Sequence, residues 1–510
     1  MQRTQKSIKN IFVALVLFAI NLVLQFVSRK VFIDKLGADV LGLNATVVSI
    51  LQFLNISELG ISSAIACTLY KPLYDKDHRS ISEVVSIHGW LYRRIGTLIT
   101  LLSAGVLLFI PMIFAKSPLP LWYAYASFVV LLLGNLPGYF LNYDQVLFSA
   151  DQRDYKIQYA YKLPMAAKVL FQILCISFFA NGYVWWLICE LAFAVLAAVL
   201  LKVSVRKSYP YLEIEFGQAR ENTLRYPGII SKVKQLFVHK VSSFALSQLS
   251  PLIIYALATL SLVTVYGNYF LIVSGVMSLL NAMFNSMNGG VGNLVAEGNK
   301  QHTLEVFGEL FTSRFLMVSV CSVIIYYMAD PFVSMWVGDE FIIDRYSLLF
   351  MVLIFYINTM RSVVDSFLNA YGLFADIWAP MTETALNIGL SILLGRMFGL
   401  PGILAGVLIS LIAIIFFWKP YYMFKKGLEA PIGIYVLKYL KHIVAFVAAF
   451  ATFRYVYTLI PLASPATVGT FVLHVIVVAL LLGMPLAAVL WVTDKGMRAF
   501  TNRIYHLIKR

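Results

Sequence analysis

Charged residues are scarce in this sequence, because Asp, Glu, Lys and Arg make up only 13% of its 510 residues. Hydrophobic residues make up 60%, whereas a water-soluble domain carries roughly 25% charged and about 45–50% apolar residues. A soluble fold of this length has too little interior to bury that apolar excess. The composition therefore excludes a soluble enzyme, a disordered chain and a fibrous repeat. It predicts an all-α, polytopic membrane protein.

Cysteine is equally scarce, and the four cysteines lie in apolar stretches without any CxxC spacing. They indicate neither a disulfide framework nor a metal site. The seven histidines form no HExxH motif, and the chain contains no Gly-Lys dipeptide, which excludes a P-loop for ATP. The segment 75–77 (DKD) mimics the DxD metal motif of glycosyltransferases, but no nucleotide-binding fold surrounds it. We expect no metal, no cofactor and no catalytic residue.

Long apolar runs fill most of the chain. About 20 apolar residues are needed to cross a bilayer core that is roughly 30 Å thick. A search of the sequence for apolar stretches of this length predicts about fourteen spans. The first run follows basic residues, as in a signal peptide, but it is long and lacks a small-residue cleavage pattern, so we interpret it as a permanent span. The predicted spans are residues 10–33, 40–70, 92–115, 121–148, 159–180, 183–203, 235–258, 262–290, 307–329, 346–368, 378–397, 400–422, 436–460 and 467–492.

The surplus of positive charge, with 40 Lys and Arg against 25 Asp and Glu, is an orientation signal. Under the predicted spans most of these cations fall in the loops of one side, and the densest groups are residues 202–240 and 419–441. Because Lys and Arg are enriched in cytoplasmic loops, both termini are predicted to be cytoplasmic. The cations are spread over many loops and form no compact face, which excludes a role in nucleic-acid binding.

The two halves of the chain show weak self-similarity. Residues 40–44 open the second predicted span and residues 265–269 open the eighth, while the turns at 181–182 and 401–402 correspond. We therefore predict two pseudo-symmetric six-helix bundles and a C-terminal helix pair. Such repeats are typical of transporters, in which two bundles rock about a site between them. The predicted domains are residues 1–205 for the N-terminal bundle, 206–234 for a cytoplasmic linker, 235–425 for the second bundle, and 426–510 for the helix pair and a cytoplasmic tail.

Cations inside the predicted spans are candidates for function, because a charge at the centre of a membrane helix costs about 2.5–3.5 kcal/mol. Arg29, His239, Lys240 and Arg361 come from three different predicted spans. If these spans enclose a cavity, the four side chains could neutralise a phosphate or diphosphate, which needs several donors in a desolvated place.

The spacing of neighbouring residues bears on this interpretation. Asn21 and Gln25 precede Arg29 at intervals of four, so a polar stripe indicates that the first span is a cavity wall. Arg361 and Asp365 are also four residues apart, and a structural ion pair within one helix explains them equally well.

Carboxylates inside the spans are candidates for ion coupling. Glu58 lies in a polar, glycine-containing stretch, and Asp365 lies beside the cation Arg361. A cavity lined chiefly by Glu58, Asp365 and Glu383 would instead favour a drug or cation antiporter. Glu190 and Arg454, in the outer halves of their spans, are interpreted as structural.

Short sequence segments, taken in their order along the chain, indicate a family more specifically than the composition does. They are residues 32–44 (FIDKLGADVLGLN), 57–65 (SELGISSAI), 69–73 (LYKPL), 239–240 (HK), 265–272 (VYGNYFLI), 292–296 (GNLVA), 336–338 (WVG), 355–361 (FYINTMR), 387–391 (NIGLS) and 418–421 (WKPY). Together they resemble the bacterial polysaccharide repeat-unit flippases, the O-antigen and capsule translocases of the multidrug/oligosaccharidyl-lipid/polysaccharide exporter superfamily.

The resemblance implies translocation of an undecaprenyl-diphosphate-linked oligosaccharide to the outer leaflet of the bacterial inner membrane by alternating access, for lipopolysaccharide O-antigen or capsule biosynthesis. The implied partners are this lipid-linked glycan and membrane lipid, together with a polysaccharide polymerase and glycosyltransferases. No bond is broken, so the protein is not expected to be an enzyme. The alternatives are an ion-coupled drug or cation antiporter of the same superfamily and a membrane-embedded polymerase or ligase. The short predicted outer loops disfavour a polymerase or ligase.

Overall fold

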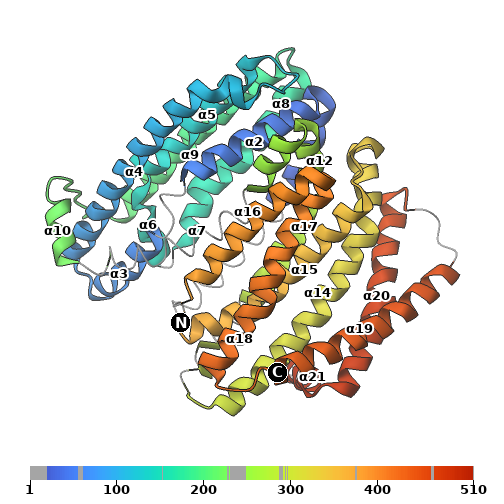
Figure 1. The fold of residues 1–510 in the computed structure, drawn as a ribbon. Coiled ribbons are helices and arrows are strands. Elements are labelled where there is room, and N and C mark those ends of the chain that lie inside the picture. Colours follow the sequence, from blue (N-terminus) through green and yellow to red (C-terminus); the bar gives the residue numbers. More distant parts are fainter. Residues whose placement is uncertain are drawn as a thin grey trace. The chain divides into compact units, whose positions relative to one another are not determined.

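The computed structural model of the chain describes residues 20–55, 61–151, 153–226, 229, 249–285, 291–292, 294–295, 297–373, 376–460 and 465–508. Figure 1 shows the helices in chain order. No strand occurs among the described residues. The all-α class predicted from the composition is therefore confirmed.

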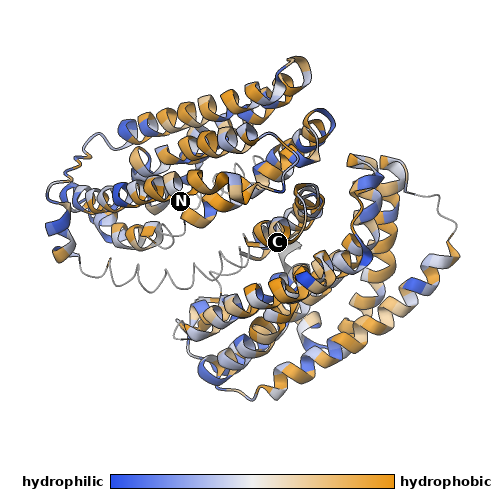
Figure 2. Ribbon diagram, turned by 45° about the horizontal axis from the view of Figure 1, so that its top comes forward, coloured by the Kyte–Doolittle hydropathy of each residue, from blue (hydrophilic) through white to orange (hydrophobic). Residues whose placement is uncertain are grey.

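Ten helices of the described part are long and apolar enough to cross a membrane. Their apolar side chains also face outward, and Leu108 and Phe178, for example, are each 80% exposed. Figure 2 shows hydrophobic residues along the length of these helices. Such surfaces belong in contact with acyl chains, so the chain is a multi-pass membrane protein. The candidate spans are His78–Ile113, Leu121–Phe140, Asp154–Phe178, Gly182–Ser208, Leu260–Asn281, Lys300–Val337, Arg345–Ala370, Leu400–Leu428, Gly433–Leu459 and Val468–Thr493.

Several helices differ from the predicted spans. The span predicted over residues 40–70 falls on α2 (Ala38–Leu54), which ends at Leu54, and on α3 (Ile61–Asp75), and residues 56–60 between them lie outside the described part. Other helices are longer than their apolar runs: α4 (His78–Ile113) and α14 (Lys300–Val337) both begin well before the predicted spans. Hydropathy averages do not detect these extensions, because charged and polar residues alternate with the apolar ones there.

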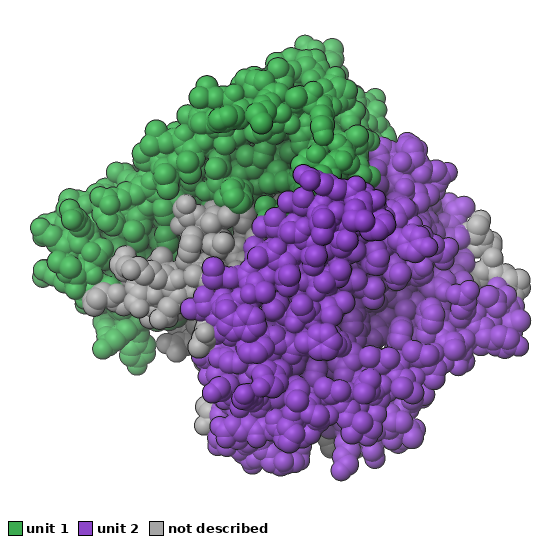
Figure 3. Space-filling model, viewed as in Figure 1, with its two compact units in different colours: residues 1–264 green, residues 265–510 purple. Residues whose placement is uncertain are grey.

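The chain forms two compact units, residues 1–264 and 265–510, which Figure 3 shows in different colours. The division lies within α12 (Leu260–Asn285), later in the chain than the linker predicted over residues 206–234. The predicted four-domain division stays a prediction.

Unit 1 is built from long helices packed in a row. α4 packs against α5, α5 against α9, and α9 against α8, as Figure 1 shows. Phe32, Val40, Ile176, Tyr183 and Leu187 form a buried apolar cluster that joins these helices to α2. The further helices of unit 1 are α5 (Leu121–Phe140), η2 (Tyr143–Gln145), α6 (Val146–Ala150), α7 (Asp154–Ile157), η3 (Gln158–Lys162), α8 (Leu163–Phe178), α9 (Gly182–Ser208) and α10 (Ala219–Arg225).

Asp77 has a structural role at the start of α4. Its carboxylate accepts hydrogen bonds from the backbone N–H of Ser80 at 3.1 Å and from the Ser80 hydroxyl at 2.6 Å. The first turn of a helix has backbone donors without helical partners, and this side chain satisfies one of them. The two hydrogen bonds hold the pKa of Asp77 below its ordinary value. Helix capping thus accounts for Asp77 in the DxD-like segment.

Two cysteines face each other in the hairpin of α8 and α9. The Sγ atoms of Cys175 and Cys189 are 3.7 Å apart. We expect copper phenanthroline to convert this pair into an intramolecular disulfide, with no loss of the folded protein, because α8 and α9 already pack side by side. Mass spectrometry of the unreduced protein checks the linkage. Cys321→Ser must leave it unchanged and Cys189→Ser must abolish it; a linkage through Cys321 would contradict the packing of this hairpin.

Unit 2 is arranged around α14. This helix packs against α15 and α20 along its length and against the C-terminal helix α21, while α20 also packs against α19. The further helices are η4 (Asp339–Phe341), α15 (Arg345–Ala370), α16 (Trp378–Phe398), α17 (Leu400–Leu411), η5 (Ile412–Trp418), α18 (Lys419–Met423), η6 (Phe424–Leu428), α19 (Gly433–Leu459), α20 (Val468–Thr493) and α21 (Lys495–Ile508).

The closest helix contact of unit 2 is the α16–α17 hairpin. A Cβ atom at Gly402 would lie 2.0 Å from the backbone oxygen of Leu394, and one at Gly406 would lie 2.4 Å from the backbone nitrogen of Ser391. Only glycine permits this approach, as is common between membrane helices. The hairpin therefore holds the buried face of α16 in a fixed position.

Asp494 joins three helices at one end of unit 2. Its carboxylate accepts hydrogen bonds from Lys438 of α19 at 2.6 Å, from Thr312 of α14 at 3.1 Å and from the backbone of Gly496 in α21 at 2.6 Å. Burial alone would raise the pKa of Asp494, but the hydrogen bonds and charge of Lys438 outweigh it and hold the pKa below its ordinary value. This junction fixes α21 and α19 to α14.

Candidate functional site

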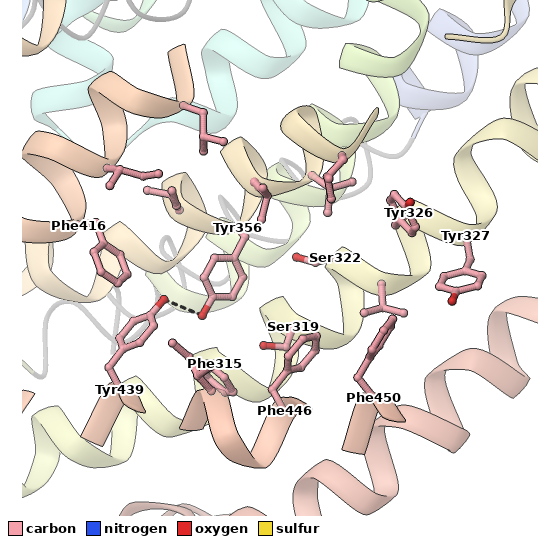
Figure 4. A pocket seen from close by; sticks show the side chains of 18 of the residues that line it. Phe315, Ser319, Ser322, Tyr326, Tyr327, Tyr356, Phe416, Tyr439, Phe446 and Phe450 are labelled. Carbon is pink, nitrogen blue, oxygen red and sulfur yellow. Dashed lines mark hydrogen bonds between the residues drawn. The ribbon is translucent and has the colours of Figure 1, made fainter. Parts of the chain in front are cut away.

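Unit 2 contains an apolar crevice with a volume of about 630 Å³. Ligand pockets commonly have volumes of about 300–1,000 Å³. Figure 4 shows aromatic side chains and two serine hydroxyls directed toward the crevice from α14, α15, η5 and α19. The labelled lining residues are Phe315, Ser319, Ser322, Tyr326, Tyr327, Tyr356, Phe416, Tyr439, Phe446 and Phe450.

The polar groups of the crevice are few. The hydroxyl of Tyr439 donates to that of Tyr356 at 2.8 Å (Figure 4). Arg345, whose Nε donates to Tyr326 Oη at 3.1 Å, and Arg454 also line it. Arg454, which the sequence suggested to be structural, therefore borders a hollow. An apolar hollow with two arginines suits a ligand that combines a hydrocarbon chain with negative charge.

A charged cluster follows the crevice along α15. Ile357 is the last α15 residue that lines the crevice, and Arg361 lies one helical turn further on. Its Nε donates to Asp365 Oδ2 at 2.7 Å, and the two side chains keep 25% and 30% of their exposure. The alternative of an ion pair within one helix is thus what the structure shows. Both side chains of the pair are thus partly exposed.

Arg314 is a buried cation that the sequence analysis overlooked. It lies inside the predicted span 307–329, is 2% exposed, and its guanidinium stacks over Phe284 at 4.4 Å. Its Nη1 donates to the Ser362 hydroxyl at 2.8 Å. A single arginine inside an apolar run was the signal that could have found it. Arg314 fixes α14 to α15 beside Arg361.

The polar residues predicted for the first span lie on the helix over residues 20–36 of unit 1. Arg29 is half-buried, and its Nη2 donates to the backbone oxygen of Thr264 at 3.0 Å. Asn21 is also half-buried and Gln25 is exposed. Arg29 thus has a partner within its own unit, as Arg361 has in unit 2.

Glu190 forms a polar cluster within unit 1. Its carboxylate accepts hydrogen bonds from Lys168 Nζ at 2.6 Å and from Gln172 Nε2 at 2.8 Å. Both charged side chains are 14% exposed. These partners give Glu190 the structural role that the sequence suggested, because they neutralise a charge that the membrane would penalise.

Glu58, His239 and Lys240 lie outside the described residues. The predicted grouping of Arg29, His239, Lys240 and Arg361 around one anion, and the coupling roles of Glu58 and Asp365, therefore stay predictions. In the part of the chain that the structure describes, no group of three or more His, Cys, Asp and Glu residues could hold a metal ion.

No protein-family model and no curated protein matches the chain in sequence. Solved structures do resemble it. An inward-facing multidrug resistance MATE family transporter of the MOP superfamily has a TM-score of 0.61 at 11% identity, over 82% of this chain and 99% of that one. The lipid II flippase MurJ, in an inward closed conformation, has a TM-score of 0.60 at 13% identity, over 96% of this chain and 99% of its own.

A third similar structure is a MOP superfamily transporter from Pyrococcus furiosus Vc1, whose binding pocket is described as having reverse polarity. It has a TM-score of 0.55 at 13% identity, over 84% of this chain and 97% of its own. At such identities the likeness shows the fold. This chain has the fold of MOP superfamily transporters, and these neighbours are transporters and flippases rather than enzymes.

Proposed function

We propose that this protein is a flippase that moves an undecaprenyl-diphosphate-linked oligosaccharide from the cytoplasmic to the outer leaflet of the bacterial inner membrane, for O-antigen or capsule biosynthesis. Both termini then lie in the cytoplasm. The ordered sequence segments suggest this substrate, and the likeness in fold to MurJ, a lipid II flippase, supports it. A polysaccharide polymerase and glycosyltransferases remain proposed partners.

The proposal rests on one observation: along α15, apolar residues that line the crevice are followed by a charged pair. Leu353 and Ile357 line the apolar crevice, and Arg361 with Asp365 follows within the next two turns. A lipid diphosphate needs both: apolar surface for its polyprenyl chain and a guanidinium for its phosphates. The oligosaccharide is too polar to cross hydrocarbon and requires a water-filled path, which alternating access provides.

The extent of the fold likeness also favours a lipid-linked substrate. The MurJ match covers 96% of this chain, whereas the MATE and Pyrococcus transporters cover 82% and 84%. The difference is comparable with the length of the C-terminal helices α19 to α21. α19 supplies Tyr439, Phe446 and Phe450 to the crevice, so this C-terminal helix contributes directly to the proposed tail site.

The second candidate is an ion-coupled drug or cation antiporter. The observation in its favour is the pair of carboxylates, Asp365 and Glu383, in the field of a single arginine, Arg361. Under this alternative the carboxylates would bind the cationic drug, and a coupling ion would displace it.

Reconstitution of the full-length protein separates the two functions. Proteoliposomes that contain an undecaprenyl-diphosphate-linked oligosaccharide are tested for the glycan's accessibility to an added lectin, and parallel vesicles are loaded with ethidium. We expect protein-dependent exposure of the glycan and ethidium leakage equal to that of protein-free vesicles. Ethidium transport without exposure of the glycan would overturn the flippase proposal in favour of the antiporter.

A further inference from the structure

Glu383 is a buried carboxylate that lacks a full set of hydrogen-bond donors among the described residues. It lies on α16, its side chain is 2% exposed, and its Oε1 has no hydrogen-bond donor among the described residues. The polar residues one and two turns further along the same buried face do have partners: Asn387 Nδ2 donates to Ser410 Oγ at 3.4 Å, and Ser391 donates to the backbone oxygen of Ile403 at 3.0 Å. A buried carboxylate in this situation favours its neutral form.

The charges that act on Glu383 come from neighbouring helices. They are Arg361 and Asp365 of α15 and Lys419 at the start of α18. α17 and η5, which pack along α16, contain no charged residue. Asp376, which precedes α16, is also buried, but its carboxylate accepts a hydrogen bond from Trp418 Nε1 at 3.3 Å. Arg361 therefore acts electrostatically on both Asp365 and Glu383, but it forms an ion pair with Asp365.

We propose that Glu383 binds a proton during transport and that its protonation makes Arg361 available to an anionic ligand; this inference rests on the proposed function. Protonation raises the net charge of the cluster of Arg361, Asp365, Glu383 and Lys419 by one unit. The neutral acid no longer competes for the guanidinium, so a diphosphate has only Asp365 to displace. By linkage, the bound diphosphate in turn favours the protonated state of Glu383.

This arrangement couples ligand binding to a proton without any covalent step. The carboxyl gains a proton from the water-filled path when the anion arrives and loses it when the anion leaves. The α16–α17 hairpin, with its close backbone contact at Gly406, holds Glu383 in place, so its charge and not its position changes. Asp365 is 30% exposed and ion-paired, whereas Glu383 is buried and its Oε1 has no donor among the described residues, as suits a proton-binding residue.

The test compares binding of undecaprenyl diphosphate to full-length wild-type protein and to Glu383→Gln at about pH 6 and about pH 8. Glutamine mimics the protonated acid at both values. We expect equal affinities at the lower pH and about tenfold weaker binding by the wild type at the higher pH. The undecaprenyl diphosphate itself also changes its charge with pH. Because both proteins bind the same ligand, the ratio of the wild-type to the Glu383→Gln dissociation constant at each pH cancels this effect. Asp376→Asn, a neutral substitution at another buried carboxylate of unit 2, must keep the pH dependence of the wild type.

The possible results distinguish the role of Glu383 from the proposed flippase function. A wild-type to Glu383→Gln ratio that stays constant with pH would overturn the role of Glu383 while leaving the flippase proposal intact. Failure of the wild type to bind undecaprenyl diphosphate at either pH would overturn the proposed function and this inference with it. Glu383→Met, which is neutral and of similar size, must reproduce the ratios of Glu383→Gln, so that the result does not depend on one variant's folding.

Discussion

Arg361→Ala is expected to lower the rate of lipid-linked oligosaccharide translocation by tenfold or more, with an unchanged amount of folded protein in the membrane. A hydrogen bond to a charged group contributes about 1.5–3 kcal/mol, which corresponds to roughly tenfold to a hundredfold. Arg361 is the partly exposed cation next to the crevice, so its loss removes the donor that we assign to the diphosphate. The measurement is the initial rate of glycan exposure in proteoliposomes.

Two controls separate this role from that of a structural ion pair. Arg396→Ala removes an exposed arginine from the last turn of α16 and must leave the rate unchanged. The double variant Arg361→Ala/Asp365→Ala leaves no unpaired carboxylate on α15. If the pair only stabilises α15, this double variant regains full activity, which would contradict the binding role of Arg361.

Leu353→Trp is expected to reduce translocation of a substrate with a full-length polyprenyl tail by about tenfold, because the indole fills the crevice that we assign to the tail. A substrate with a short prenyl chain needs less of this space and is expected to keep most of its rate. Losing the contact between the tail and an apolar surface the size of one large side chain costs about 1.5–3 kcal/mol of binding free energy. The measurement is the ratio of the two initial rates in the same vesicles.

Leu393→Trp is the matched control, because Leu393 is 58% exposed on α16 and does not line the crevice. It must leave both rates unchanged. An equal loss of rate for long and short chains in Leu353→Trp would indicate damage to the fold rather than a blocked tail site, and would contradict the assignment of the crevice.

The helical fold could be predicted from the sequence because it depends on a single physical requirement. Every backbone polar group inside a bilayer needs a partner within the protein, so long apolar runs must be helices. The same argument fails at helix ends. The residues before the apolar runs of α4 and α14 mix charged, polar and apolar types, so their mean hydropathy does not mark them as part of a span.

The candidate site could be predicted only in part. Arg361 and Asp365 were identifiable as charges in an apolar run, and their spacing indicated the ion pair that the structure shows. The crevice could not be predicted, because its lining comes from side chains of α14, α15, α17, η5 and α19, and only the packing of these elements brings them together. Phe446 and Phe450 of α19 have the spacing of a lipid-facing stripe, and only the packing of α19 against α14 gives them a different role.

Glu383 shows a further limit of the sequence. It was identifiable as one of several acids in predicted spans, but the sequence did not show which of these acids have hydrogen-bond partners. The structure separates them by their partners: Glu190 accepts hydrogen bonds from Lys168 and Gln172, whereas Oε1 of Glu383 has no donor among the described residues. Partners of this kind come from other helices, so they depend on packing and cannot be inferred from spacing along one helix.

Photocrosslinking tests the central claim, that unit 2 holds a lipid diphosphate by its tail and its head, most directly. Full-length protein in vesicles is illuminated with undecaprenyl diphosphate that carries a diazirine in the tail, and the labelled peptides are identified by mass spectrometry. We expect labels on crevice residues of α15 and α19, among them Leu353 and Phe446, and weaker labelling of these residues in Arg361→Ala. Labels confined to lipid-exposed positions such as Leu108 and Phe178, with no dependence on Arg361, would contradict it.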